Sequence, residues 1–259
     1  MSISKMPEIG WVIHDSSGLV ADRCRAWSLR CGFLEEQIYV INNFGGDPAP
    51  GEISGNNTAY EFSGYAHALD LMQGEGPFVL VNDTLFRHHW SNSWRIMLQN
   101  LLKKSDFCAQ EGGILGDLRR ESIEFPEKPL TYWASWILFM SDRTALQRIR
   151  TALERVNRAD WTLSSPAYDA YVMQWLQRPW WRGGWQGNPT SAAIQRKKIS
   201  IRREHELSRI LLREQGLPAL ALGHHQPLRY RITRWVDRFL ARYSALMRRT
   251  NSSKDNGQP

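Results

Sequence analysis

The sequence lacks an apolar run long enough to cross a membrane. Its longest nearly apolar stretch, Tyr132–Met140, is far shorter than the roughly 20 residues that a transmembrane helix needs. Residues 1–15 contain no apolar core of the kind found in secretory signal peptides. Only three cysteines are present, Cys24, Cys31 and Cys108, and their spacing fits no metal site. A small, odd number of cysteines is typical of a reducing compartment, so we expect a cytoplasmic protein.

Charge is distributed unevenly along the 259 residues. Residues 1–177 contain 16 Lys and Arg against 21 Asp and Glu, whereas residues 178–259 contain 17 against 5. A hydrophobic content of 42% allows a large core, so the chain needs no disulfide or metal in order to fold. A basic segment after an acidic one indicates an anionic partner, which at this point is nucleic acid, a membrane surface or a phosphorylated ligand.

Short apolar runs alternate with helical periodicities over the first half of the chain, which predicts an α/β fold. The expected strands are Ile9–His14, Gln37–Asn42, Pro77–Val81, Asp106–Glu111 and Trp133–Met140. The expected helices are Leu19–Cys31, Ser63–Gln73, Ser91–Lys104 and Asp142–Asn157. The segment 44–55 is rich in Gly and Pro, so we expect it to be irregular.

The second half of the chain differs in character from the first. Asp160–Asn188 holds five tryptophans, and helices are expected at Ser200–Gln215 and Pro227–Arg249. We therefore expect a sheet domain over residues 1–190 and a helical region over residues 191–249, with a disordered tail over residues 250–259.

Polar side chains and glycines follow the expected strands at the points where they end. These residues include Asp15, Asn42, Asn43, Asn82, Asp83 and Glu111. In open α/β sheets ligands bind beyond the carboxyl ends of the strands, so the pattern predicts a binding site. Asn, Asp and Gly also favour turns, which is the simpler explanation of any one position, whereas recurrence at four strand ends favours a site. Asp83 follows a strongly apolar strand and is a candidate ligand for Mg²⁺ or Mn²⁺, although it is also suited to capping the next turn.

Four sequence blocks carry a resemblance to a known family. IYVINNFGGD, GNNTAYEFSGYAHALD, PFVLVNDTLF and TYWASWILFMSDRTAL resemble, in this order, motifs of family-2-like glycosyltransferases. The second and third blocks are most similar to the rhamnan synthesis protein F group. The resemblance covers about residues 9–157 and implies a GT-A (Rossmann-like) mixed sheet flanked by helices, with a C-terminal helical extension in this chain.

The resemblance also implies roles for particular residues. A nucleotide-sugar donor would lie above the sheet, beside Asp15 and Asn82, with the nucleoside near Asn42 and Asn43. Asn56 and Glu61 would lie near the donor sugar and phosphates. Asp83 would bind a divalent metal, Mg²⁺ or Mn²⁺, and a later histidine, His224 or His225, would complete that site. The chain departs from the family at Asn42, where an acidic residue is usual, and at Asn82-Asp83-Thr84, which has one carboxylate where many members have two.

An inverting transfer also needs a base that accepts the proton of the acceptor hydroxyl. The candidates are Glu111, which follows an expected strand, Asp169 in the tryptophan-rich segment, and Glu204 and His205 in a late helix. For each of them a solvated surface residue is the more common interpretation, because most charged side chains are exposed.

The last expected helix combines an apolar face with many arginines. Its apolar positions are Leu228, Ile232, Trp235, Val236, Phe239, Leu240, Tyr243 and Met247, and only Asp237 opposes its seven arginines. The pattern is typical of a helix that lies on an anionic membrane surface, and it also suits a helix that packs on the body of the protein or on a second subunit. The tryptophan-rich segment suits an acceptor wall for sugar rings, single-stranded nucleic acid, or plain packing.

From these observations we expect a glycosyltransferase that moves a sugar from a nucleotide-diphosphate donor to a growing surface polysaccharide. The acceptor would be a glycan, with a lipid-linked one favoured, and the enzyme would lie on the inner face of the cell membrane through residues 227–249. Two alternatives stay open: a nucleic-acid-binding protein that uses the basic segment, although no DNA- or RNA-binding motif is present, and a catalytically inactive transferase-like scaffold.

Overall fold

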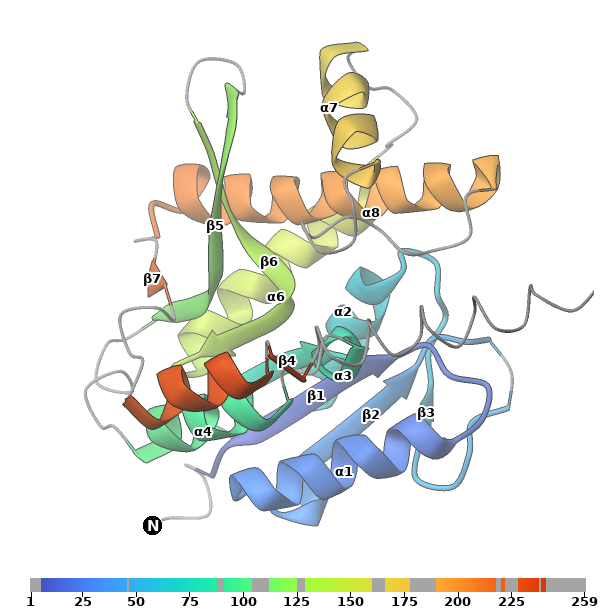
Figure 1. Ribbon diagram of the computed structural model, residues 1–259. Coiled ribbons are helices and arrows are strands. Elements are labelled where there is room, and N and C mark those ends of the chain that lie inside the picture. Colours follow the sequence, from blue (N-terminus) through green and yellow to red (C-terminus); the bar gives the residue numbers. More distant parts are fainter. Residues whose placement is uncertain are drawn as a thin grey trace, which may run out of the picture.

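The computed structural model describes residues 6–45, 47–87, 91–103, 112–124, 129–159, 166–177, 190–217, 220–221, 228–237 and 239–240. These residues form an α/β fold around a mixed sheet with helices on both faces (Figure 1). The strand order is β3-β2-β1-β4-β6-β5-β7. The expected α/β class and the mixed sheet flanked by helices are therefore confirmed.

One half of the sheet is parallel. It consists of β1 (Glu8–Ile13), β2 (Ile38–Asn42), β3 (Ile53–Ser54) and β4 (Phe78–Asn82). All residues of β1 and β4 are buried, because helices cover both faces of this half. Ile9, Trp11 and Ile13 of β1 contribute to the core on one face, and Val12 contributes to the core on the other.

The other half is built on a long antiparallel hairpin. β6 (Pro129–Met140) runs antiparallel to β4 and to β5 (Ile114–Glu124), and β7 (Leu220–Ala221) pairs with β5. Gly116 pairs with Leu138, whereas the next residue, Asp117, pairs with Ala134. Residues 135–137 of β6 therefore have no partner in β5, and this bulge marks the point where the hairpin extends beyond the parallel strands (Figure 1).

Helices form a layer on each face of the sheet. On one face α1 (Leu19–Cys31) and α4 (Ser91–Lys103) pack in one core, and on the other α2 (Glu61–Leu71) and α6 (Arg143–Arg158) pack in a second. The long helix α8 (Ser191–Arg209) continues into a π-helical turn, η4 (Ile210–Glu214), and contacts β6 and α6. α7 (Pro166–Leu176) packs against α8. Short helical turns are η2 (Glu35–Gln37) and α3 (Thr84–Arg87).

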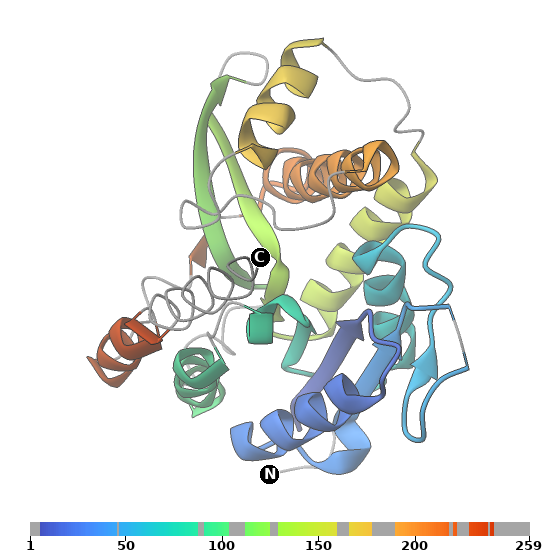
Figure 2. The same cartoon turned by 45° about the vertical axis from the view of Figure 1, so that its right-hand side comes forward.

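A further helix comprises residues 228–237 and 239–240 and is called the C-terminal helix below. It lies beside α4 in both views (Figures 1 and 2). In the part of the chain that the structure describes, no helix is both long and apolar enough to span a membrane.

Most of the expected elements are confirmed to within a few residues, and three expectations need correction. The segment 44–55 was expected to be irregular, but Ile53–Ser54 pairs with β2 as β3. The strand β5 was not expected at all. The helix expected at Ser200 begins at Ser191, where Thr190 accepts a hydrogen bond from the Ala193 N–H as its cap. The strand expected at Asp106–Glu111 lies outside the described residues.

Candidate active site

The carboxyl ends of β1, β2 and β4 meet at one edge of the sheet. β2 follows β1 in the chain and pairs with one side of it, whereas β4 pairs with its other side. The order in which successive strands are added to the sheet therefore changes direction between β1 and β4. Ile13 pairs with Asn42, and Val12 pairs with Asn82. Such a topological switch point is where open α/β sheets bind ligands. The structure thus brings together the predicted residues Asp15, Asn42, Asn43, Asn82 and Asp83, which we call the strand-end set.

Within this set, Asn42 holds the loops together. Its Nδ2 donates to the carbonyl of Asp15 (2.7 Å) and to Glu52 Oε2 (2.9 Å), and its Oδ1 accepts from the N–H groups of Asp15 (3.3 Å) and Phe44 (3.0 Å). A side-chain amide has two donor hydrogens and two acceptor lone pairs, so these four bonds use its full capacity. Asn42 thus shapes the rim of the site through contacts within the chain.

Asp15 organises the entry to α1. Its carboxylate accepts hydrogen bonds from the Val20 N–H (3.0 Å) and from the hydroxyl and N–H of Ser17. Burial alone would raise the pKa of Asp15, but these hydrogen bonds outweigh it and lower the pKa below its ordinary value. The side chain is therefore ionised at neutral pH and engaged by its own helix.

The loop that begins α2 is held under backbone strain. Tyr60 has φ 56° and Asn57 has φ 47°, in a region that residues other than glycine seldom occupy. The carbonyl of Tyr60 accepts from Asn43 Nδ2 (2.7 Å) and from the Ser63 hydroxyl (2.9 Å), which fixes the strained turn against β2. Asn56, a predicted donor-binding residue, is exposed beside it and accepts from the Thr58 N–H. Strain of this kind is concentrated at functional sites.

Tyr65 of α2 is buried at the centre of a polar cluster. We call it the Tyr65 cluster, and it comprises Tyr65, Glu61, Asn82, Ser135 and Glu204. Its hydroxyl donates to the carbonyl of Ser135 at 2.6 Å. Burial raises the pKa of the Tyr65 phenol, the carboxylates of Glu61 and Glu204 raise it further, and a side-chain hydrogen bond with Asn82 opposes them. Asp83 also acts on this phenol. Three predicted residues, Glu61, Asn82 and Asp83, therefore lie around the same side chain as the candidate base Glu204.

Glu204 reaches the cluster from α8. The bulge in β6 leaves Ser135 without a partner in β5, and the Ser135 N–H donates to Glu204 Oε1. Burial raises the pKa of the Glu204 carboxyl, and the hydrogen bond from Ser135 and the charges of Arg119 and Lys197 counter this only in part. A carboxyl group with a raised pKa is suited to general base catalysis near neutral pH. On the same helix, the Ser200 hydroxyl donates to Glu61 Oε1 (2.8 Å), which ties α8 to the start of α2.

Arg203, next to Glu204, is the unexpected member of the site. Only 7% of its surface is exposed, and its Nε and Nη1 atoms have no hydrogen-bond partner among the described residues. The guanidinium lies over the ring of Tyr60, with Cζ 5.8 Å from the ring centroid. Burial lowers the pKa of Arg203, while Tyr60 and Glu61 counteract this effect. A buried cation with unused donors beside a helix N-terminus is a ready site for an anion.

Two of the candidate bases, Asp169 and His205, do not join the Tyr65 cluster. Asp169 lies on α7, 3.8 Å from Lys198 Nζ, and α7 stands on the side of α8 away from the parallel strands (Figures 1 and 2). His205 is buried against Tyr132, Tyr168 and Tyr171, with Nδ1 2.9 Å from the Tyr168 hydroxyl. Burial lowers the pKa of His205 to about 3, so it is neutral and serves in packing. Glu111, His224 and His225 lie outside the described residues.

Residues that can hold a divalent cation are few at this site. The described ranges contain no cluster of three or more His, Cys, Asp or Glu side chains arranged to bind a metal. Mg²⁺ commonly binds through one or two carboxylates, with substrate phosphates and water supplying the other oxygens, and Asp83 fits that smaller requirement.

Sequence reasoning missed Arg203, Tyr60 and Tyr65. A signal for Arg203 was available, because it shares the spacing of three and four with Ser200, Leu207 and Ile210, which are buried on α8 and on the turn η4 that continues it. An arginine at a buried helix position needs an anionic or hydrogen-bonding partner.

Comparison of this chain with known protein families, with curated proteins and with solved structures finds no match.

Proposed function

We propose that the protein is a glycosyltransferase of the GT-A type, which transfers a sugar from a nucleotide-diphosphate donor to a hydroxyl group of a growing surface polysaccharide. The Tyr65 cluster carries the proposal, because it groups residues from α2, β4, β6 and α8 at the switch point of the sheet. Support also comes from the family resemblance of residues 9–157, which implies a donor at this place.

Glu204 is the proposed base. Its carboxylate removes the proton from the acceptor hydroxyl as that oxygen forms a bond to the anomeric carbon of the donor sugar. The bond between this carbon and the diphosphate oxygen breaks, and the nucleoside diphosphate leaves with the electron pair. Glu204 is half-buried with a raised pKa, whereas Asp169 is paired with Lys198 and His205 is enclosed by tyrosines. Among the candidates that the structure describes, Glu204 is therefore the preferred base.

Arg203 is the proposed ligand of the diphosphate. Its unpartnered Nε and Nη1 atoms supply two hydrogen-bond donors beside the N-terminus of α2, and a charged donor is about twice as strong as a neutral one. Asp83 would hold Mg²⁺ or Mn²⁺, which would neutralise further charge on the leaving group when bound. The guanidinium would add positive charge at a site where Asn82-Asp83-Thr84 offers a metal only one carboxylate.

A thermal-shift screen of nucleotide sugars with Mg²⁺ or Mn²⁺ tests donor binding, because a ligand that binds only the folded state raises its stability. We expect a donor to raise the Tm of the wild-type protein, and Arg203→Gln to reduce this shift. Arg202→Gln is the matched control, since Arg202 neighbours Arg203 but lies against Tyr168. The absence of any shift with nucleotide sugars, or an equal loss in both variants, would contradict the assignment.

Turnover is tested separately by measuring release of the nucleoside diphosphate. We expect Glu204→Gln to bind the donor normally and to lose turnover by about 10²- to 10⁴-fold, the usual contribution of general base catalysis. Donor binding without turnover in the wild-type protein would instead identify an inactive transferase-like scaffold.

A further inference from the structure

The C-terminal helix is attached to the body through the face opposite to its apolar residues. Tyr230 and Asp237, seven residues and two helical turns apart, are its buried positions. Asp237 Oδ2 accepts a hydrogen bond from the Ser93 N–H (3.0 Å) in the first turn of α4, and the ring of Tyr230 contacts that of Trp94. An acidic group at a helix N-terminus is stabilised by the helix dipole, so this contact fixes the rotation of the C-terminal helix.

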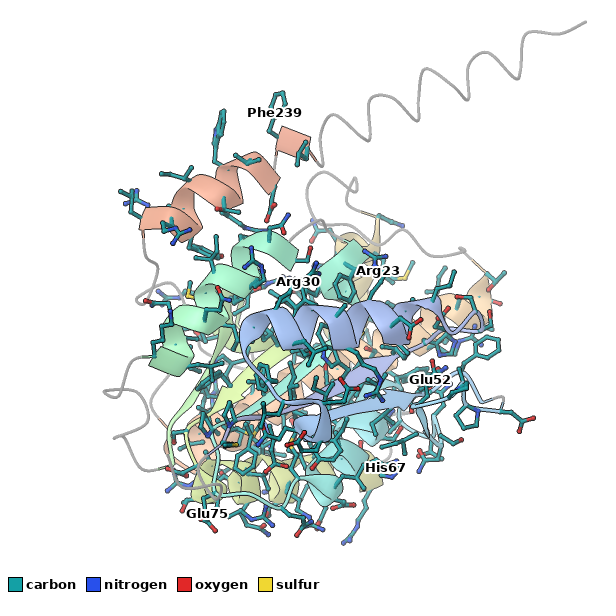
Figure 3. The ribbon with its side chains drawn as sticks, turned by 90° about the horizontal axis from the view of Figure 1, so that it is seen from below. Arg23, Arg30, Glu52, His67, Glu75 and Phe239 are labelled. Carbon is teal, nitrogen blue, oxygen red and sulfur yellow. The ribbon has the colours of Figure 1, made fainter. Side chains whose placement is uncertain are left out.

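Because of that rotation, the apolar face points away from the protein. Six large apolar side chains are exposed on it: Leu228 (69%), Ile232 (57%), Trp235 (69%), Val236 (40%), Phe239 (57%) and Leu240 (46%). Figure 3 shows Phe239 directed away from the body, and its ring stacks on that of Trp235. A contiguous exposed patch of this kind on a folded protein indicates an interaction surface.

Basic side chains border this apolar face. Arg229 and Arg231 of the same helix are exposed, and the only acidic residue of the helix, Asp237, is buried against α4. In Figure 3, Arg23 and Arg30 both lie on the same side of α1. The side chain of Phe239 is directed toward that side of the molecule. Both arginines are exposed. The surface therefore combines an apolar band with positive charge, and the acidic residue of the helix is buried on its opposite face.

We propose that this surface docks on an anionic lipid membrane. The apolar band would enter the boundary between headgroups and acyl chains, while the arginines would contact lipid phosphates. A second copy of the chain fits less well, because a two-fold interface would place this basic helix against the same basic helix. Nucleic acid also fits less well, since a phosphate backbone satisfies the arginines but leaves the apolar band in water.

Vesicle flotation of the full chain tests the proposal. We expect the protein to float with vesicles of phosphatidylcholine containing about one quarter phosphatidylglycerol, and not with pure phosphatidylcholine. The double variant Ile232→Glu/Trp235→Glu should lose at least about tenfold in vesicle affinity, because burying apolar area drives the insertion. Leu34→Glu, another exposed apolar position, is the matched control and should bind as the wild type does.

A second variant separates charge from apolar insertion. Arg229→Gln/Arg231→Gln should weaken binding to the anionic vesicles by roughly fivefold for each arginine lost, and high salt should reproduce this loss. Both double variants change exposed side chains, and unchanged circular dichroism and Tm verify that they fold.

Equal binding to neutral and anionic vesicles, or no binding to either, would overturn the proposal. A dimer that Ile232→Glu/Trp235→Glu disrupts, without vesicle binding, would identify a second copy, and retention by single-stranded oligonucleotides at physiological salt would identify nucleic acid.

Discussion

Buried His205 should make the stability of this protein fall on mild acidification. The imidazole is 6% exposed, and burial lowers its pKa from 6.5 to about 3. Below its ordinary pKa the unfolded chain takes up a proton at this residue that the folded chain does not bind. Protons therefore favour the unfolded state, and the free energy of unfolding decreases as the pH falls through the interval between the two pKa values.

The size of the effect follows from the unfolded pKa, as long as the folded value stays well below the pH of the measurement. Each pH unit below the ordinary value of 6.5 then costs about 1.4 kcal/mol. Between about pH 7 and about pH 5 the contribution of His205 is a loss of about 2 kcal/mol, which is a large part of the stability of a typical domain.

Urea unfolding at these two pH values measures this contribution. His205→Gln removes the titrating ring, so the stability of this variant should decrease by about 2 kcal/mol less than that of the wild type. Tyr168→Phe is the control, because it removes the hydroxyl that lies 2.9 Å from His205 Nδ1 but keeps the histidine buried. It should lower stability at both pH values and retain the wild-type pH dependence. The same pH dependence in His205→Gln and the wild type would refute the reasoning.

Three further predictions concern the site and the packing around it. Asp237→Ala removes the acceptor for the Ser93 N–H and should lower the free energy of unfolding by about 1 to 2 kcal/mol, measured in urea. Gly64→Ala places a Cβ 2.6 Å from Val12 Cγ1, so overpacking should cost about 1 to 3 kcal/mol in the same assay. Turnover should rise with pH through the raised pKa of Glu204, because the base must be ionised, and this rise should be absent from the residual activity of Glu204→Gln.

The sequence predicts best those elements whose signal is local. β1, β2 and β4 are short apolar runs between turns, and α1 ends at Cys31 because Gly32, with φ 103°, caps it. β5 was missed because Asp117, Arg119 and Arg120 interrupt its apolar alternation, so that its strand conformation depends on pairing with β6. β3 has only two residues and exists through its pairing with β2. Neither strand has the alternation of apolar and polar residues by which a strand is identified from sequence alone.

The candidate site divides in the same way. Asp15, Asn42, Asn43, Asn82 and Asp83 are predictable, because a position at or just after the end of a parallel strand already places a residue at the carboxyl edge of the sheet. Arg203 and Glu204 are far from these residues in sequence. Glu204 meets Ser135 only because the bulge in β6 breaks the pairing with β5 there. No local pattern encodes such a meeting, since it depends on how α8 crosses the hairpin.

The C-terminal helix shows why an apolar stripe does not by itself reveal which face is buried. Its periodicity predicts one apolar face, and packing of that face on the body was one of the alternatives. The structure instead buries Tyr230 and Asp237 and exposes Trp235 and Phe239. A carboxylate withdrawn from water needs hydrogen-bond donors, and the N-terminus of α4 provides one at Ser93. Exposed apolar area costs roughly 25 cal/mol for each Å² in water, so a helix held in this orientation is stabilised by any apolar phase that covers it.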